Sequence, residues 1–128
     1  MRITSRHINA LSRVVFIGAL IGTSYLALTP KTYPLVETVS DKAKHMIAFF
    51  VLAWLCDISF PKSPFSFAKI CFLLGYGFFL ELWQYYLPYR EFSILDLLAD
   101  SLGLFLYLIL RPLIMRCPLF KWQWNALL

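Results

Sequence analysis

The sequence predicts an all-α integral membrane protein, a bundle of four transmembrane helices that forms one domain over residues 1–128. Of its 128 residues, 60% are hydrophobic and 15% are charged, whereas a typical soluble domain has about 25% charged residues. The mean hydropathy is +0.69. The apolar residues gather in four long segments, separated by short stretches that contain prolines and charges. These observations together favour a polytopic membrane protein over a soluble domain.

The first helix is expected at about residues 9–29. The basic residues Arg2, Arg6 and Arg13 precede its apolar stretch, and a basic start followed by an apolar run also describes a secretory signal peptide. However, there is no clear small-x-small cleavage site, and further apolar segments follow. We therefore expect an uncleaved transmembrane helix that ends before Pro30.

The second helix is expected at about residues 42–60, with Ser40 or Asp41 as its N-cap. Its uninterrupted apolar core, Met46–Cys56, is only 11 residues long, and a hydrocarbon core needs about 20. This segment can span a membrane if its polar first turn lies in the interface or faces other helices. Pro61 is expected to end it.

The third and fourth helices are expected at about residues 65–87 and 93–115. Ser93 is a suitable N-cap for the fourth, and Arg111 marks its far membrane interface. The cysteines show no metal-binding or redox spacing, so we interpret them as inert; they are Cys56, Cys71 and Cys117.

The positive charges predict that both termini are cytoplasmic, because cytoplasmic loops are enriched in Lys and Arg. Eight basic residues fall on the side of the termini: Arg2, Arg6, Arg13, Lys62, Lys69, Arg111, Arg116 and Lys121. Four fall on the other side: Lys31, Lys42, Lys44 and Arg90. These residues flank apolar segments and form no basic stripe, so we exclude nucleic acid as a partner.

Polar residues concentrate at the outer ends of the second, third and fourth helices. Asp41 and His45, Glu81 and Gln84, and Asp96 and Asp100 are spaced three or four residues apart, and Lys42 and Arg90 lie close by in the sequence. Residues at this spacing share a helix face. Because carboxylates that face lipid are unfavourable, we expect the polar residues to line one wet cleft that opens to the outer leaflet.

A purely structural role is the alternative for these residues. Lys42 or Arg90 would then neutralise Asp96 or Glu81, because buried charges are normally paired. However, buried ion pairs rarely gain net stability, so the full set favours a functional site. Gly103 continues the face of the aspartates and lets a neighbouring helix approach closely.

The sequence resembles the VanZ-like family of small bacterial membrane proteins, which is named for a member associated with teicoplanin resistance. The resemblance covers about residues 20–110 and rests on these segments: SYLALTP at 24–30, DKAKH at 41–45, E-x-x-Q at 81–84, P-x-R at 88–90, Asp96, and D-x-x-G at 100–103. It implies a multi-pass protein of the bacterial cytoplasmic (inner) membrane. Where the family usually has Asn, this chain has Asp100. That residue adds a carboxylate or a protonated donor to the cleft, so the resemblance alone does not extend antibiotic resistance to this chain.

The first functional hypothesis is that the cleft binds or shields an envelope lipid, a lipid-linked cell-wall precursor or a glycopeptide. The residues expected to bind the ligand are Asp41, Lys42, Gln84, Arg90 and Asp100. Arg90 and Lys42 would hold a phosphate.

The second hypothesis is a membrane-embedded hydrolase or transferase that acts on a lipid headgroup. His45 and Glu81 would act as acid and base, and Asp96 would orient His45 or Arg90. The sequence spacing shows no obvious nucleophile–base pair.

The third hypothesis is a divalent metal site. His45, Glu81, Asp96 and Asp100 offer one imidazole and three carboxylates, but no two of them have a known metal-binding spacing, so no cofactor is expected. An ion or proton pathway is disfavoured, since the inner halves of the helices contain few polar residues. The oligomeric state stays open: Gly18 and Gly22 form a G-x-x-x-G pattern, which suits pairing with another chain and packing within the monomer equally well.

Overall fold

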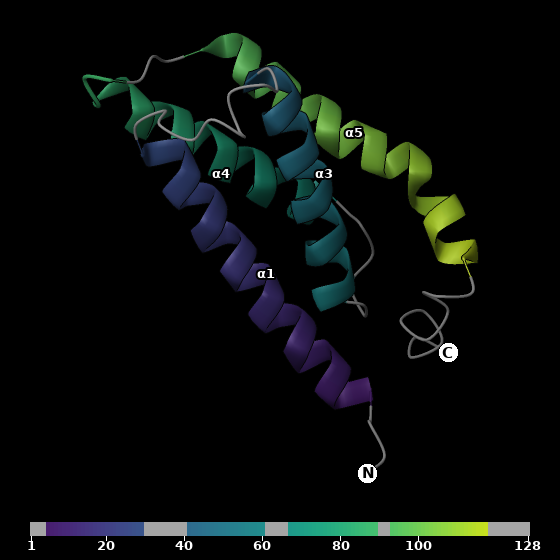
Figure 1. Ribbon diagram of the computed structural model, residues 1–128. Coiled ribbons are helices and arrows are strands. Elements are labelled where there is room, and N and C mark those ends of the chain that lie inside the picture. Colours follow the sequence, from purple (N-terminus) through teal and green to yellow (C-terminus); the bar gives the residue numbers. More distant parts are fainter. Residues whose placement is uncertain (1–4, 30–40, 61–66, 90–92, 118–128) are drawn as a thin grey trace.

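The computed structural model describes residues 5–29, 41–60, 67–89 and 93–117 (Figure 1). These residues form four helices: α1 (Ser5–Leu28), α3 (Asp41–Ser59), α4 (Phe67–Tyr85) and α5 (Ile94–Arg116). The all-α prediction is confirmed for this part of the chain, and most predicted helix ends lie within two residues of those observed. The exception is the start of α1, which lies four residues earlier than expected. Hydropathy marks where a helix becomes apolar, and the helical backbone continues beyond that point into polar residues.

Helix α3 is the centre of the bundle, because it contacts each of the other three helices and packs most extensively against α5 (Figure 1). Its side chains Phe49, Leu52 and Ala53 are almost completely buried. Phe16 of α1 and Tyr107 of α5 pack into the same core. A helix surrounded in this way can carry polar residues that would be unfavourable on a helix exposed to lipid.

Two glycines allow close contacts between helices. A Cβ atom added at Gly103 of α5 would overlap the carbonyl oxygen of Met46 in α3, so the predicted close approach at Gly103 is confirmed. A Cβ added at Gly77 of α4 would lie 2.7 Å from Asp100 Oδ2, so this glycine makes room for a carboxylate. By contrast, added Cβ atoms at Gly18 and Gly22 meet nothing within 4 Å. The G-x-x-x-G pattern is therefore not used for packing among the described residues.

Helix α1 is hydrogen-bonded to its neighbours in its N-terminal half and at its C-terminal end. Arg13 Nε donates to the Ser59 carbonyl oxygen of α3 at 3.1 Å. At the other end, the hydroxyl of Tyr89 donates to the carbonyl oxygen of Leu28 at 2.7 Å. The last carbonyl groups of a helix have no partner within the helix, so this contact stabilises the end of α1.

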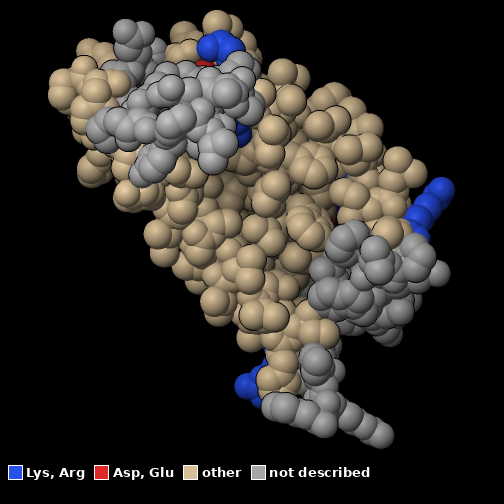
Figure 2. All heavy atoms as spheres, in the orientation of Figure 1, with Lys and Arg blue, Asp and Glu red and all other residues tan. Residues whose placement is uncertain are grey.

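The outer surface is largely apolar. By length and composition, the segments Arg6–Leu28 and Ile94–Arg116 are each apolar enough to cross a membrane, and only 11% and 28% of their most apolar stretches is buried. Such low burial differs from that of a core helix in a soluble protein. The face in Figure 2 shows Lys and Arg mainly near its margins and almost no acidic residues. This surface is suited to contact with lipid.

Candidate functional site: a carboxylate–histidine cluster

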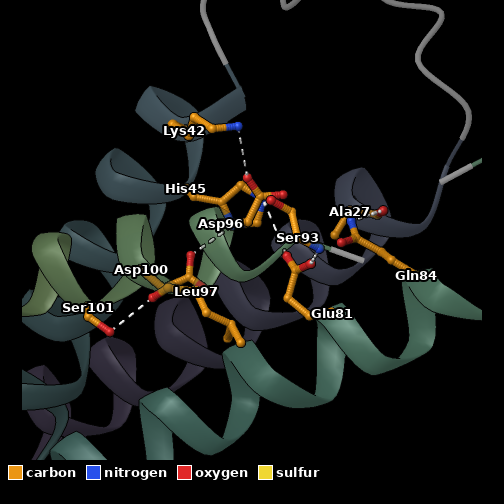
Figure 3. A network of polar contacts seen from close by, with 10 residues as sticks. All are labelled: Ala27, Lys42, His45, Glu81, Gln84, Ser93, Asp96, Leu97, Asp100 and Ser101. Carbon is orange, nitrogen blue, oxygen red and sulfur yellow. Dashed lines mark hydrogen bonds and ion pairs between the residues drawn. The ribbon is translucent and has the colours of Figure 1, made fainter. Parts of the chain in front are cut away.

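Four of the residues singled out in the sequence lie together at one end of the bundle (Figure 3). His45 comes from the second turn of α3, Glu81 from the end of α4, and Asp96 and Asp100 from the first two turns of α5. We call these four residues the carboxylate–histidine cluster. The helical spacing predicted that three separate helix ends meet in this way, and the structure brings them together.

His45 lies at the centre of the cluster, and both of its ring nitrogens face carboxylates. Nδ1 is 2.7 Å from Asp100 Oδ1, which is hydrogen-bonding distance. Nε2 lies 3.6 Å from Asp96 Oδ2 and 3.9 Å from Glu81 Oε1. These longer distances are those of ion pairs, and they exceed normal hydrogen-bond lengths.

The cluster is buried on one side and accessible on the other. The side chains of Glu81 and Asp100 are 0% and 1% exposed, whereas those of His45 and Asp96 are 16% and 13% exposed. Lys42 lies at the accessible rim, where its Nζ is 3.7 Å from Asp96 Oδ1. A ligand would therefore approach from the side of Lys42 and Asp96.

The cluster has more acceptors than donors. The backbone N–H of Ser93 donates to Glu81 Oε2 at 3.1 Å. Three other buried oxygens have no hydrogen-bond partner among the described residues: Glu81 Oε1, Asp96 Oδ1 and Asp100 Oδ2. Because buried polar atoms without partners are rare and costly, the cluster has the composition expected of a site that holds a positively charged or donating ligand.

Ser93 precedes α5 at the N-cap position, as expected, but its side chain makes no capping hydrogen bond. The predicted N-cap position is therefore confirmed, without a hydrogen bond from the serine side chain. The extended backbone of Ser93 instead directs its N–H to Glu81. The N-cap residue thus joins α5 to the end of α4 and positions one carboxylate of the cluster.

The other predicted ligand-binding residues do not all join the cluster. The Gln84 side chain points toward α1, and its Nε2 donates to the Ala27 carbonyl oxygen at 2.7 Å (Figure 3). Gln84 therefore joins two helices. Asp41 is the first residue of α3, but its side chain, like the whole of Arg90, lies outside the described residues.

Sequence reasoning missed a second polar cluster toward the opposite ends of the same three helices. Asp57 of α3 is fully buried. Its Oδ1 accepts from Lys69 Nζ of α4 at 3.1 Å, and its Oδ2 accepts from the Tyr107 hydroxyl at 2.5 Å and from Arg111 Nε at 2.7 Å, both of α5. We call these residues the Asp57 cluster.

A helical spacing in α5 could have revealed this second cluster. Tyr107 and Arg111 lie four and eight residues after Gly103, on the face that already carries Asp96 and Asp100. Residues spaced three or four apart lie one above the other on a helix. Extending this pattern places Tyr107 and Arg111 on the face of α5 that packs against α3, where Asp57 lies. In the sequence alone, Lys69 and Arg111 were interpreted only as charges that flank the membrane.

An apolar groove runs along the seam between α4 and α5. It is lined by Ile70, Leu74, Ser101, Leu104, Phe105 and Leu108. Ser101 directly follows Asp100, and Leu74 lies two helical turns before Glu81. The groove is therefore lined by the same two helices that supply Glu81, Asp96 and Asp100 to the carboxylate–histidine cluster.

Comparison with known proteins places the chain in a family. It is similar to an uncharacterized protein of the fission yeast Schizosaccharomyces pombe, with 33% identity over 103 residues. The match covers 77% of this chain and 61% of that relative, so the chain spans less than two thirds of the relative's length. No solved structure matches. The family described as VanZ/LLP1 matches residues 6–115, which include all four described helices almost completely. The chain therefore belongs to the VanZ/LLP1 family.

Proposed function

We propose that all four helices span the membrane, with both termini in the cytoplasm and the carboxylate–histidine cluster near the outer face. Successive helices run in alternating directions (Figure 1). With 19 residues each, α3 and α4 are about 28 Å long at 1.5 Å per residue, close to the ~30 Å hydrocarbon core. The end of the bundle that holds the Asp57 cluster carries more basic residues, which favours a cytoplasmic location for it.

Cysteine labelling in intact cells tests this topology. In a variant without Cys56, Cys71 and Cys117, Tyr89→Cys should react with a membrane-impermeant thiol reagent, because Tyr89 is exposed near the proposed outer face. The matched control is a variant that keeps only Cys117, which follows α5 at the opposite end and should react only after lysis. Labelling of position 89 only after lysis would overturn the topology.

The function that the geometry supports best is binding of an envelope lipid or lipid-linked cell-wall precursor in the bacterial cytoplasmic membrane. The observation that carries this proposal is that helices α4 and α5, which line an apolar groove, also supply three residues of a partly accessible, acceptor-rich cluster. A lipid has the same arrangement, with a polar headgroup joined to apolar chains. The headgroup would lie beside His45 and Asp96, and an acyl or isoprenyl chain would lie between α4 and α5.

The charge of the cluster restricts the part of the ligand that binds there. Within the described residues, three carboxylates face one histidine and one lysine at the rim. An amine of a headgroup or of a precursor peptide would complement this charge directly. A phosphate alone would be repelled, unless a cation lies between it and the carboxylates.

Lipid co-purification tests the binding proposal. Ser101→Trp places a large side chain in the groove, whereas the exposed neighbour Leu102 provides the matched control Leu102→Trp outside it. Native mass spectrometry of the protein released from membranes should show bound lipid in the wild type and in Leu102→Trp, and little in Ser101→Trp. Equal lipid occupancy in all three proteins would contradict the proposal.

A second candidate is a hydrolase or transferase that acts on the same headgroup. The hydrogen bond between His45 and Asp100 favours it, because a carboxylate that holds an imidazole in place is a common feature of acid–base catalysis. His45 would transfer the proton, with Glu81 and Asp96 around the reacting group. Release of a headgroup from purified lipid by the wild type, and no release by His45→Ala, would establish this activity.

If the ligand is a wall precursor, the same site gives a route to glycopeptide resistance. A precursor held by the protein would be shielded from an antibiotic that binds its peptide. Expression of the wild type should then raise the inhibitory concentration of teicoplanin, and Ser101→Trp should abolish the increase while Leu102→Trp retains it. No increase with the wild type would exclude resistance without excluding lipid binding.

A further inference from the structure

We propose that His45 Nε2, Glu81 Oε1 and Asp96 Oδ2 bind a divalent transition-metal cation, and that Asp100 orients the histidine ligand. This inference goes beyond the proposed lipid site, because the metal would bind in the absence of lipid. It rests on the distances between the three ligand atoms, on a buried oxygen without a partner, and on the hydrogen bond behind the imidazole.

The three ligand atoms are close enough to share one ion. One ligand atom from each of His45, Glu81 and Asp96 lies within 4.8 Å of the other two. Nε2 is 3.6 Å from Asp96 Oδ2 and 3.9 Å from Glu81 Oε1. Metal–ligand bonds of 2.0–2.2 Å in a tetrahedral site place ligand atoms about 3.3 Å apart. Side-chain movements that close these distances, by at most about 1.5 Å for any pair, would therefore complete the site.

The state of the Glu81 carboxylate favours a cation between Glu81 and the imidazole of His45. Its side chain is completely buried, and Oε2 is held by the backbone N–H of Ser93. The second oxygen, Oε1, has no hydrogen-bond partner among the described residues and faces the imidazole. A buried carboxylate oxygen in this state is costly unless a positive charge lies close to it.

Asp100 sets the imidazole in the orientation that a metal requires. With Nδ1–H donating to Asp100 Oδ1 at 2.7 Å, the lone pair of Nε2 points toward Glu81 and Asp96. A carboxylate that accepts from the far nitrogen of a metal-bound histidine is a recurring feature of metal sites. Without a cation, the Nε2 lone pair would face two carboxylate oxygens. With the proton on Nδ1, either a metal ion or a second proton on His45 must therefore occupy this position.

The ligand set indicates the class of metal and its chemistry. One imidazole and two carboxylates suit Zn²⁺ or Mn²⁺ better than Cu⁺, which prefers sulfur ligands. Three protein ligands leave at least one position for water or for an oxygen of a bound ligand. The partial exposure of His45 and Asp96 places that position on the accessible side. A phosphate oxygen of a headgroup can bind there, because the ion neutralises the carboxylates that would otherwise repel it.

Metal titration of the purified protein tests the inference. The cysteine-free protein, prepared without a histidine tag and stripped with EDTA in a lipid-free detergent, is titrated with ZnCl₂ by calorimetry and with MnCl₂ by electron paramagnetic resonance. We expect one equivalent of bound metal. His45→Ala and Glu81→Gln should lose it, whereas His7→Ala, which alters an exposed histidine outside the cluster, should retain it.

Asp100→Asn adds a measurement that separates positioning from folding. Its amide oxygen still accepts from Nδ1, so the stoichiometry should stay at one while the affinity falls about 10- to 100-fold, as for other outer ligands of metal sites. An unchanged melting temperature of each metal-free variant would show that the variant folds. If His45→Ala does not fold, Glu81→Gln provides the test, because it keeps the oxygen that accepts from the Ser93 N–H.

Three results would overturn the inference: no metal bound by the wild type, undiminished binding in His45→Ala and Glu81→Gln, or loss of binding in His7→Ala. The first would mean that the carboxylates are balanced by protons instead of a metal ion. Because no lipid is present, failure here leaves the proposed lipid binding intact. Conversely, metal binding combined with equal lipid occupancy in the groove variants would contradict the lipid proposal alone.

Discussion

The Asp57 cluster and the carboxylate–histidine cluster come from the same three helices, but their charges are balanced in opposite ways. In the Asp57 cluster, one carboxylate receives hydrogen bonds from a lysine, a tyrosine and an arginine. In the carboxylate–histidine cluster, three carboxylates share one histidine, and three of their oxygens have no hydrogen-bond partner among the described residues. Within the described residues, the carboxylate of the first cluster has donors for both of its oxygens, whereas the second cluster has the excess of acceptors that the proposed ligand or metal would satisfy.

This difference leads us to assign a structural role to the Asp57 cluster and a ligand-binding role to the carboxylate–histidine cluster, in line with the proposals above. Removing one partner from a satisfied buried ion pair leaves an uncompensated charge and destabilises the fold. Removing one of several crowded carboxylates lowers their mutual repulsion. The two clusters should therefore respond to substitution in opposite ways, although both are buried and both belong to α3, α4 and α5.

The largest effect is expected for Asp57→Ala. It leaves Lys69 and Arg111 without their carboxylate in a buried position, so the free energy of unfolding should fall by about 3–5 kcal/mol. Denaturant titration in detergent micelles, followed by circular dichroism, measures it. The double variant Asp57→Ala/Lys69→Met should recover part of the loss, because it removes one of the two cations that Asp57 neutralised. No recovery would argue against charge balance as the cause.

The next largest effect is expected for Gly103→Ala, which tests the close approach that brings α5 against α3. The added Cβ would overlap the Met46 carbonyl oxygen, so the helices must separate, at a cost of about 1–3 kcal/mol. Gly18→Ala is the matched control, because nothing lies within 4 Å of its added Cβ. A loss of stability in Gly18→Ala as large as that in Gly103→Ala would contradict this packing.

A smaller effect is expected for Tyr107→Phe, which removes one donor to Asp57 and keeps the ring in the core. Asp57 still has Lys69 and Arg111, so the loss of unfolding free energy should be about 1 kcal/mol. Tyr85→Phe, at a tyrosine that is 65% exposed, should change stability very little. Equal effects of the two variants would mean that the Tyr107 hydroxyl does not support the cluster.

The smallest effect is expected for Lys42→Ala at the rim of the carboxylate–histidine cluster. The lysine side chain is 54% exposed and its ion pair with Asp96 is 3.7 Å long, so the loss should stay below about 1 kcal/mol. The same denaturant titration, repeated at high salt, measures it. A loss as large as that of Asp57→Ala would show that the rim is part of the structural frame.

Much of the carboxylate–histidine cluster could be predicted from the sequence, because charged residues within apolar segments stand out and helical spacing assigns them to faces. His45, Glu81, Asp96 and Asp100 were found in this way. Gln84 shares a face with Glu81, but spacing does not show that its side chain turns to Ala27. That choice depends on where the end of α1 lies, which is a matter of tertiary packing.

The Asp57 cluster was harder to predict, because its members resemble ordinary features of membrane segments. A lysine at the start of one helix and an arginine near the end of another are typical of membrane interfaces. Only the three-dimensional arrangement shows that Lys69 is 7% exposed and bonded to Asp57. The helix boundaries were predicted to within two residues where prolines or turns limit them, and less well at the polar start of α1.

The most direct test of the contrast between the clusters compares two amide substitutions of nearly unchanged shape, Asp57→Asn and Glu81→Gln, in metal-free protein. The measurement is the free energy of unfolding in one detergent. We predict that Asp57→Asn is strongly destabilised, whereas Glu81→Gln is as stable as the wild type or more so, because its amide still accepts from Ser93 and can donate toward Asp96. A loss of stability in Glu81→Gln as large as that in Asp57→Asn would contradict the account, since both clusters would then be structural.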